Sequence, residues 1–484
     1  MSPDLHAAAV KNPKMRGGPF MAVDKSHLDD VKALLEYTLN DQKPLIEFAQ
    51  GVESLDQLLR SDAKGFCLEP LYAQVPDVLK GYVELVYDLN NQPAIRFIEG
   101  LLYKSKYYDE TQQSVSLSLI NSDEQPFVLS TPRLKNDSNV EIHEPFSSSV
   151  YDELFRLKHV PIKMKELSSL VEVPDEDLPV FHSLFTADSP ADTADQKYRG
   201  DGVRIRYFGH ACLLVEDKHV AILIDPLISY NYPDSEKRYT FSDLPNEIDY
   251  IVITHGHLDH IVLETLLQLR YKTKNIIVPK TSKGFLAEPS LKVLLKNLGF
   301  KCNIIELDEL EEVELPAGIL TAIPFLGEHH DLNISGKSAY RIQLNGRSFL
   351  IAADSANLEP RLYDHIHDNF GPVDTLFLGM ECDGAPLTWF YGPLLTQQLD
   401  RDMAYSRQGS GSDEPRATKL LDSLKCKQAY IYAMGLEQWF GHILSLNYND
   451  ESKQIVESNR FIAQCKDRGI HSERLYAAGE FFFD

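Results

Sequence analysis

The spacing of apolar residues differs between the first part of the chain and the rest. In the first part, leucine and valine residues recur every three or four positions and predict a helix over residues 28–39. A second helical region is predicted over residues 75–103, and alternating apolar residues predict short strands over residues 115–119 and 127–129. The pattern therefore predicts a mixed α+β domain over residues 1–185.

After a linker, the pattern changes to strands interleaved with helices. Residues 186–202 are rich in Ala, Asp, Ser and Gly and have no apolar rhythm, which is typical of a solvated linker. Apolar runs beyond it predict strands at residues 203–208, 211–215, 220–225, 250–254, 276–278, 302–307, 320–325, 339–344, 348–352, 375–379 and 429–433. A helix fits residues 261–269, and residues 401–419 are predicted to be a mobile surface loop. The interleaving indicates a layered α/β domain over residues 203–484.

Composition narrows the classes of function. The 484 residues include 48 Lys and Arg against 72 Asp and Glu, a net charge of −24, which argues against broad binding to nucleic acids or anionic membranes. No stretch approaches the roughly 18 apolar residues of a membrane span, and the first 18 residues lack the apolar core of a signal peptide. Six scattered cysteines without a CxxC pair indicate reduced thiols in a cytoplasmic protein.

The most informative segment is Thr254-His-Gly-His-Leu-Asp-His260, which follows an apolar run typical of a buried strand. It places His255, His257, Asp259 and His260 within six residues. In a turn after a strand, His255 and His257 can converge on one metal ion, while Asp259 and His260 face a second. The alternative is a merely polar turn, but three His and one Asp at this spacing favour a metal site.

This H-x-H-x-D-H pattern resembles the metallo-β-lactamase superfamily, whose fold is an αββα sandwich. The resemblance implies that Asp225, which ends a predicted strand, orients the ligand loop from behind. It also implies that Asp354 bridges the two metals and that His442 is a late ligand of the second metal. His365, His367 and His471 also lie downstream, so the position of His442 rests on its order along the chain.

The segment over residues 324–331 distinguishes two kinds of metal centre. Dizinc hydrolases of the superfamily normally have a His ligand here, whereas this sequence has Glu328, His329 and His330 in a row. If Glu328 is the ligand, the added carboxylate suits iron, because hard anionic oxygens stabilise Fe(III). If His329 or His330 is the ligand, the centre looks more like zinc. The residue types leave both alternatives open.

Over most of its length the sequence resembles a family of diiron β-hydroxylases built on the metallo-β-lactamase fold. The resemblance covers residues 85–91, 96–99, 126–133, 208–211, 327–329 and 381–387 together with the ligand loop. In that family the glutamate of a Gly-Glu-His motif is an iron ligand, which maps onto Glu328. The resemblance implies two iron ions, one held by His255, His257 and Glu328 and the other by Asp259, His260 and His442, with Asp354 bridging.

The same resemblance implies an O2-dependent monooxygenase of natural-product biosynthesis. The enzyme would hydroxylate the β-carbon of an amino acid tethered to a carrier domain of a nonribosomal peptide synthetase. An external electron donor is needed, because the sequence shows no flavin or nicotinamide fingerprint. The N-terminal domain would cover the site, help to dock the synthetase and offer an interface for a homodimer.

Two rival functions remain beside this one. A dizinc hydrolase of the same fold would use a metal-bound hydroxide on a lactone, phosphodiester or thioester. A metal-stabilised scaffold without turnover is the third, although the intact ligand set speaks against it. The identity of the amino acid and of the reductase stays open, as does hydroxylation against desaturation or N-oxygenation.

Overall fold

The computed structural model describes residues 23–128, 132–188, 195–233, 235–397, 399–444 and 446–484. The expectation about a signal peptide at the N-terminus therefore lies outside the described residues, as does part of the predicted linker. Within the described ranges, no helix is long and apolar enough to cross a membrane.

Two seven-stranded sheets form the centre of the molecule. The first has the order β10-β9-β8-β7-β6-β5-β18 and consists of β5 (Val203–Gly209), β6 (Cys212–Glu216), β7 (Ala221–Ile224), β8 (Ile248–Val252), β9 (Thr273–Pro279), β10 (Asn303–Leu307) and β18 (Gly479–Phe483). The second has the order β11-β12-β13-β14-β15-β16-β17 and consists of β11 (Glu312–Leu315), β12 (Gly318–Ile323), β13 (Ala339–Leu344), β14 (Arg347–Ile351), β15 (Thr375–Gly379), β16 (Gln428–Tyr432) and β17 (His471–Arg474). The strands predicted beyond residue 203 are thus confirmed, with bounds shifted by a few residues.

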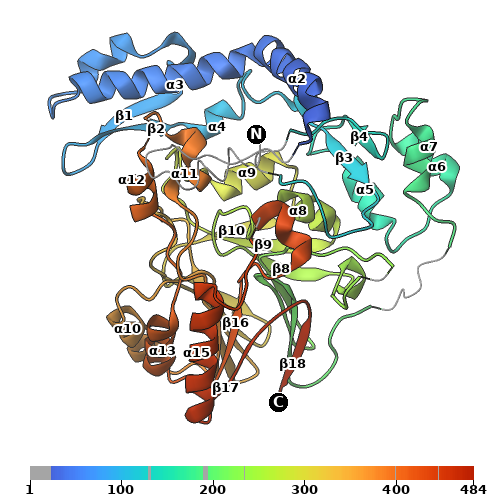
Figure 1. The fold of residues 1–484 in the computed structure, drawn as a ribbon, viewed down its shortest axis with the longest axis vertical. Coiled ribbons are helices and arrows are strands. Elements are labelled where there is room, and N and C mark those ends of the chain that lie inside the picture. The colour runs from blue at the N-terminus through green and yellow to red at the C-terminus, as the bar shows by residue number, and fades with distance from the viewer. Residues whose placement is uncertain (1–22, 129–131, 189–194, 234, 398, 445) are drawn as a thin grey trace.

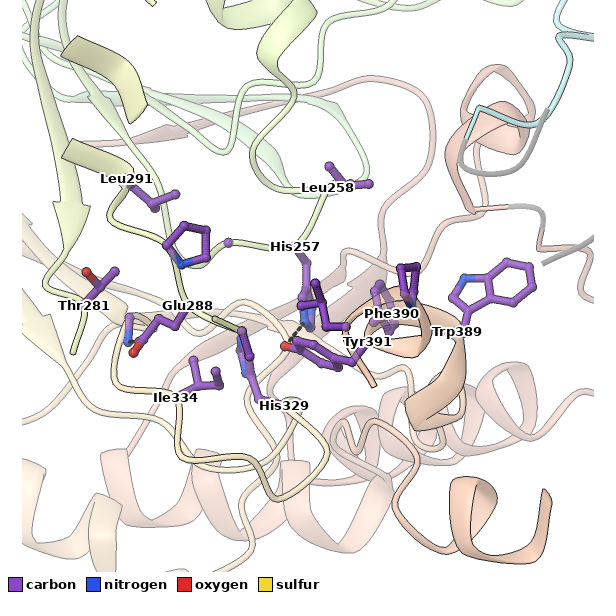
Figure 2. Close-up of a pocket in the computed structure, with 16 residues that line it drawn as sticks. His257, Leu258, Thr281, Glu288, Leu291, His329, Ile334, Trp389, Phe390 and Tyr391 are labelled. Atoms are coloured by element: carbon purple, nitrogen blue, oxygen red, sulfur yellow. Dashed lines mark hydrogen bonds between the residues drawn. The ribbon is translucent and has the colours of Figure 1, made fainter. Parts of the chain in front are cut away.

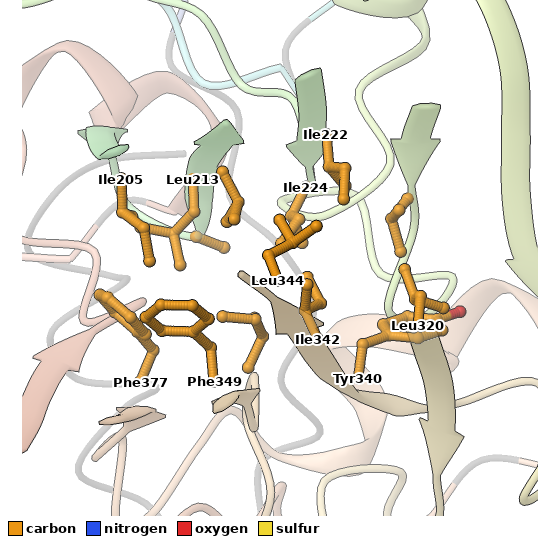
Figure 3. Close-up of a cluster of buried hydrophobic side chains, with 14 of the residues drawn as sticks. Ile205, Leu213, Ile222, Ile224, Leu320, Tyr340, Ile342, Leu344, Phe349 and Phe377 are labelled. Carbon is orange, nitrogen blue, oxygen red and sulfur yellow. The ribbon is translucent and has the colours of Figure 1, made fainter. Parts of the chain in front are cut away.

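The inner faces of the two sheets pack directly on each other. Figure 3 shows Ile205, Leu213 and Ile222 of the first sheet above Phe349 and Phe377 of the second. All five side chains are buried, because both faces of each sheet are covered and the strands are apolar on both sides. This shared core fixes the relative position of the strand ends that carry the polar residues.

Helices cover the two outer faces. The helices α8 (Leu263–Leu269) and α9 (Leu291–Asn297) bury leucines against the first sheet. The second sheet is covered by α10 (Arg361–Phe370), α13 (Glu414–Leu424) and α15 (Lys453–Asp467), which lie together in Figure 1. The layers are therefore helix, sheet, sheet, helix, the αββα sandwich that the sequence predicted.

The N-terminal part lies beyond α8 and α9, across the top of Figure 1. It contains α2 (Leu28–Asp41), α3 (Lys43–Asp62), the hairpin β1 (Val83–Tyr87) and β2 (Pro93–Phe97), α4 (Glu99–Leu102), the hairpin β3 (Val115–Ser118) and β4 (Asn139–Ile142), α5 (Val150–Arg156), α6 (Met164–Leu170) and α7 (Leu178–Ser183). It has two small cores of its own, one around Leu55 and one around Tyr151. The helix predicted over residues 28–39 is confirmed by α2.

The helical region predicted over residues 75–103 is wrong over most of its length. A β-hairpin occupies residues 83–97 instead. Apolar residues alternate there, with Val83 and Leu85 buried, and Asn91 in the turn has a left-handed φ of 58°. Alternation with a turn residue between the two runs is typical of a hairpin. The strand predicted over residues 127–129 is also not formed at Phe127 and Val128.

A buried arginine joins the N-terminal part to the sandwich. Arg270, at the end of α8, donates from Nε to Asp152 of α5 at 2.8 Å. Its other nitrogens donate at 2.6 Å to the carbonyls of Phe146, Ser148 and Leu298. Four bonds from one side chain therefore hold residues 146–152 and Leu298 to the end of α8.

The prediction of a mobile loop over residues 401–419 is also wrong. The segment contains α12 (Arg401–Ser406) and the start of α13, and Ser412 between them is fully buried. Its glycines and serines allow close packing against the site described below. The remaining short helices are α11 (Leu387–Phe390), α14 (Gly441–Leu444), η1 (Lys25–His27), η2 (Glu69–Gln74), η3 (Asp77–Leu79), η4 (Glu110–Gln112), η5 (Phe241–Asp243), η6 (Arg270–Lys272), η7 (Gly392–Leu394) and η8 (Gln438–Phe440).

Candidate metal centre

Polar residues gather where strands of the two sheets end. Asp225 follows β7, and the ligand loop follows the neighbouring parallel strand β8. Asp354 follows β14, and Glu381 follows β15, the parallel neighbour of β14. Because the carboxyl ends of parallel strands meet at one edge of a sheet, the fold brings together residues that are far apart in sequence.

His255, His257 and Glu328 form the first half of the cluster. Nε2 of His255 and Nδ1 of His257 face each other at 3.1 Å. Oε1 of Glu328 lies 3.1 Å from the same Nδ1 of His257. All three side chains are buried. Two imidazole nitrogens and a carboxylate oxygen therefore converge on one point.

His260 and Asp354 connect this half to the second. Nδ1 of His260 donates to the buried Oδ2 of Asp225 at 2.8 Å, which leaves Nε2 as the nitrogen with the free lone pair. That Nε2 lies 2.9 Å from Oδ2 of Asp354 and 3.7 Å from Oδ2 of Asp259. Oδ2 of Asp354 is also 3.6 Å from Nε2 of His255, so Asp354 lies between the two halves.

Asp225 anchors the ligand loop from behind. It accepts hydrogen bonds from the backbone N–H of Thr254 at 2.8 Å and from its hydroxyl at 2.6 Å, besides the bond from His260. Burial raises the pKa of Asp225, and the neighbouring His260 opposes this rise. The carboxylate thus fixes both the path of the loop and the orientation of one imidazole, as partners behind metal ligands commonly do.

His210, in the loop between β5 and β6, also contacts the cluster. Its Nε2 lies 3.0 Å from Oδ2 of Asp259, and its Nδ1 accepts a hydrogen bond from the N–H of Gly435 at 3.2 Å. Nδ1 is therefore the unprotonated nitrogen, and Nε2–H donates to Asp259. His210 orients a carboxylate instead of offering a lone pair to a metal.

The three consecutive candidates at residues 328–330 have different surroundings. His329 stacks on His257 with ring centroids 4.5 Å apart, so it lies beside the first half of the cluster together with Glu328. Nδ1 of His330 instead bonds to the carbonyl of Arg407 at 2.7 Å. Of the two histidines, His329 is the one placed to compete with Glu328 for a metal.

The structure does not bring His442 to the cluster. Its backbone carbonyl accepts from the N–H of Val128 at 2.8 Å, and the groups that influence its ring are Trp439 and Glu264. None of the described groups of converging ligand atoms includes it. Order along the chain selected His442, and order alone does not fix where a ring lies.

Replacing His442 with Ala is therefore expected to leave two metal ions per chain. Replacing His260 with Ala is expected to remove at least one, because Nε2 of His260 lies 2.9 Å from Asp354 at the centre of the cluster. Iron analysis of both variants purified without oxygen measures the difference. Loss of one ion from the His442→Ala variant would support the assignment made from the sequence.

Glu381 is a further carboxylate of this site. Burial raises the pKa of Glu381 well above its usual value, and the carboxylates of Glu328, Asp354 and Asp259 add to the rise. The ligand set predicted from the sequence does not include this residue, because acidic residues are common in loops. Its position directly after β15, beside the strand that carries Asp354, was the available signal.

The crowded carboxylates of the cluster indicate that cations bind among them. Burial, followed by Asp354 and Asp259, raises the pKa of Glu328 well above its usual value. Burial alone would lower the pKa of His260, but the carboxylates of Asp354, Asp259 and Asp225 outweigh it and raise this pKa. Carboxylates crowded in a buried site cannot all ionise unless positive charge lies among them. Metal ions supply such charge.

The buried polar atoms of the cluster that have no hydrogen-bond partner also indicate bound metal ions. Among the described residues, buried atoms without a hydrogen-bond partner include His260 Nε2, Glu328 Oε2, His329 Nδ1 and Asp354 Oδ1. A buried polar atom without a partner is costly, so this concentration indicates a bound group. Imidazole nitrogens mixed with carboxylate oxygens are a donor set that suits iron. The residues present therefore fit a pair of iron ions.

A pocket of about 240 Å³ lies beside the cluster. Figure 2 shows His257 and His329 between Thr281 and Glu288 on one side and Trp389 on the other. The Phe390 ring stacks on His257 at 4.6 Å with an interplanar angle of 11°. The hydroxyl of Tyr391 lies 3.5 Å from Nε2 of His257. The ring of His257 thus separates the cluster from the pocket.

Comparison with known proteins agrees with this geometry. The N-terminal domain of diiron non-heme β-hydroxylases matches residues 1–190, and a β-lactamase superfamily domain matches residues 221–385. The chain is 36% identical to the 4-amino-L-phenylalanyl-[CmlP-peptidyl-carrier-protein] 3-hydroxylase of Streptomyces venezuelae over 485 residues, which covers 98% of this chain and 90% of that protein. A metal-dependent hydrolase of Thermococcus kodakarensis is 26% identical over 179 residues, 36% of this chain and 71% of that protein.

Comparison with solved structures also finds a β-hydroxylase of Streptomyces venezuelae. The crystal structure of CmlA, a diiron β-hydroxylase from Streptomyces venezuelae, matches with a TM-score of 0.89 and 35% identity, covering 100% of this chain and 91% of that one. Both the N-terminal part and the sandwich are therefore shared with that enzyme. The chain belongs to the family of diiron non-haem β-hydroxylases built on the metallo-β-lactamase fold.

Proposed function

We propose that this protein is an O2-dependent diiron monooxygenase that hydroxylates the β-carbon of a carrier-tethered amino acid. The carrier is a domain of a nonribosomal peptide synthetase, and the pathway makes a natural product. The observation that carries the proposal is the buried carboxylate of Glu328 at 3.1 Å from His257 within a chain of this family. The relative of known substrate acts on an aminoacyl group held by a peptidyl carrier protein.

The proposed ligands follow the contacts of the cluster. His255, His257 and Glu328 hold one iron, Asp259 and His260 hold the other, and Asp354 lies between them. Glu381 is the remaining carboxylate of the cluster. His442 is not one of the proposed ligands. When bound, the two irons supply the activation of O2, while the protein's own residues orient the substrate and exclude water. Insertion of one oxygen atom consumes two electrons and two protons, so an external electron donor belongs to the proposal.

The pocket suits a tethered substrate. Leu258 and Leu394 line it and are 46% and 40% exposed, whereas Leu291, Thr281 and Glu288 are buried. A tethered group needs such an open mouth, because its thioester arm stays attached to the carrier during reaction. A volume of about 240 Å³ is below the roughly 300–1,000 Å³ of pockets for whole ligands, so it fits one side chain.

The wall of the pocket predicts a large, uncharged side chain. Trp389, Phe390 and Leu291 are apolar, and the Glu288 carboxylate is already occupied by donors from Ser282, Ser335 and Gly336. A carrier loaded with a phenylalanyl or tyrosyl group is expected to show kcat/KM about 10–200-fold above one loaded with alanyl. Product analysis after single turnovers measures this ratio. Equal rates for alanyl and phenylalanyl carriers would contradict it.

The function itself is tested by metal analysis and turnover. Protein purified without oxygen is expected to hold two irons and, with a loaded carrier, a reductant and O2, to form the β-hydroxylated product. A His257→Ala variant is expected to lose iron and activity. His367→Ala, whose ring is partly exposed on α10, is the matched control and should retain both. Two zinc ions with no oxygen consumption would defeat the proposal.

A dizinc hydrolase is the second candidate, and His329 favours it. Its ring lies with His255 and His257 in one group of converging ligand atoms, so an all-histidine first site is geometrically available. Colour separates the two candidates, since an oxidised diiron protein absorbs in the near-ultraviolet and a zinc protein does not. Hydrolysis of a thioester without O2 would support the zinc enzyme.

We also infer how the chain is divided into domains and where the enzyme works. Residues 1–185 form an N-terminal domain that docks the carrier and offers a homodimer interface, residues 186–202 form a linker, and residues 203–484 form the catalytic domain. The matches of separate family models to residues 1–190 and 221–385 support this division. The enzyme works in the cytoplasm, where its six free cysteines stay reduced.

A further inference from the structure

A six-residue segment, Arg407-Gln-Gly-Ser-Gly-Ser412, reaches the cluster between α12 and α13. Its contacts with the loop that carries Glu328 are reciprocal. The carbonyl of Ser410 accepts from the N–H of Glu328 at 3.1 Å. The carbonyl of Arg407 bonds to His330 Nδ1 at 2.7 Å, and its guanidinium donates to the carbonyl of His330 at 2.7 and 3.0 Å. The segment thus holds this loop on both sides of His329.

The same segment also holds the loop that follows Glu381. The N–H of Gly409 donates to the carbonyl of Ala385 at 2.9 Å, and the carbonyl of Gly409 accepts from Gly384 at 2.7 Å. The N–H of Gly411 donates to the carbonyl of Cys382 at 3.2 Å. One segment therefore connects the two loops that carry Glu328 and Glu381.

Its glycines allow this close approach. A Cβ at position 409 would lie 3.2 Å from Oε2, 3.3 Å from the backbone carbonyl oxygen and 3.4 Å from Oε1 of Glu328. A Cβ at position 411 would lie 3.1 Å from Cβ of Glu381 and from two backbone nitrogens. Such separations are tighter than ordinary contact, so any other residue would press on the glutamates.

The loop of Glu328 needs support of this kind. Gly327, Glu328, His330 and Asp331 all have left-handed φ angles, between 56° and 86°. Outside glycine this conformation costs of the order of 1–3 kcal/mol per residue and persists only where surrounding contacts impose it. The hydrogen bonds from residues 407–410 are contacts of that kind.

We propose that residues 407–412 are a positioning element of the diiron centre, and that Gly409 sets the position of the Glu328 carboxylate. This inference rests on the proposed role of Glu328 as an iron ligand. A methyl group at position 409 pushes the carboxylate away from His257, whereas the strand-end ligands stay in place.

The test compares Gly409→Ala with Gly100→Ala, an exposed glycine in α4 whose Cβ would meet open space. Gly409→Ala is expected to keep its melting temperature within a few degrees but to bind iron about 10–100-fold more weakly. Its near-ultraviolet spectrum after oxidation is expected to change. Gly100→Ala is expected to match the wild type in all three measurements.

A second variant separates pressure on the carboxylate from general damage. Glu328→Asp shortens the side chain by one methylene and withdraws the carboxylate from position 409. Adding Gly409→Ala to Glu328→Asp is therefore expected to change iron affinity less than threefold, so that the double-mutant cycle is strongly non-additive.

The remaining outcomes of these experiments would contradict either the role of Gly409 or the proposed function. Additive losses, unchanged iron affinity in Gly409→Ala, or failure of both alanine variants to fold would overturn the role of Gly409. Absence of iron from the wild-type protein would instead overturn the proposed function. The two failures are thus distinguishable.

Discussion

Replacing Asp354 with Asn is expected to abolish hydroxylation and to lower the iron content below two per chain. Oδ2 of Asp354 lies 2.9 Å from His260 and 3.6 Å from His255, so this carboxylate is the contact common to both halves of the cluster. The substitution keeps the shape of the side chain but removes the negative charge that would neutralise both irons in the proposed ligand set. Because partners behind the ligands already cost about 10–100-fold in affinity or activity, we expect more than about 100-fold here.

Asp364→Asn, on the exposed side of α10, is the control for this substitution. It removes the same charge from the same sandwich without touching the cluster. Iron content and single-turnover product yield measure both variants. Two tightly bound irons in Asp354→Asn would exclude the bridging position for this residue.

Replacing Arg270 with Met is expected to lower the free energy of unfolding by about 3 kcal/mol or more. The guanidinium is buried and bonds to Asp152 and to three backbone carbonyls. The buried carbonyl of Leu298 and the partly buried carbonyls of Phe146 and Ser148 would lose their donor, and a buried acceptor left without a partner costs about 1–3 kcal/mol. Urea unfolding measured by circular dichroism gives the change in stability.

Arg133→Met is the matched control at the same seam. Arg133 pairs with Glu264 of α8 at 3.3 Å, but both side chains are more than 60% exposed. An exposed ion pair contributes about 0–1 kcal/mol, so this variant is expected to stay close to the wild type. Equal destabilisation by the two substitutions would contradict the role given to burial.

The sandwich and the centre of the site could be predicted, because local pattern and chemistry coincide there. The ligand loop directly follows an apolar strand, and the strands after residue 203 are apolar runs bounded by turn residues. The direction of Glu328 could not be predicted, since it depends on a left-handed backbone imposed by residues 407–412. Sequence spacing carries no information about such a distant contact.

The wrong secondary-structure predictions for residues 75–103 and 401–419 have related causes. The sequence pattern predicts a helix where the hairpin at residues 83–97 lies, because the apolar residues there are dense enough to satisfy both periods. The composition of residues 401–419 predicts a mobile loop, because glycine and serine usually indicate backbone flexibility. Here the glycines serve close contact with Glu328 and Glu381. In both cases the long-range packing partner decided the outcome.

The pairing of β18 with β5 has a consequence for biosynthesis on the ribosome. Arg204 of β5 contacts Glu480 of β18 across 276 residues of sequence. At about 5–20 residues per second, translation takes roughly 14–55 s to cover that distance. During this interval β5 has an open edge that can pair with a neighbouring nascent chain. Chaperone demand in heterologous expression is therefore expected to be greatest before the final strand emerges.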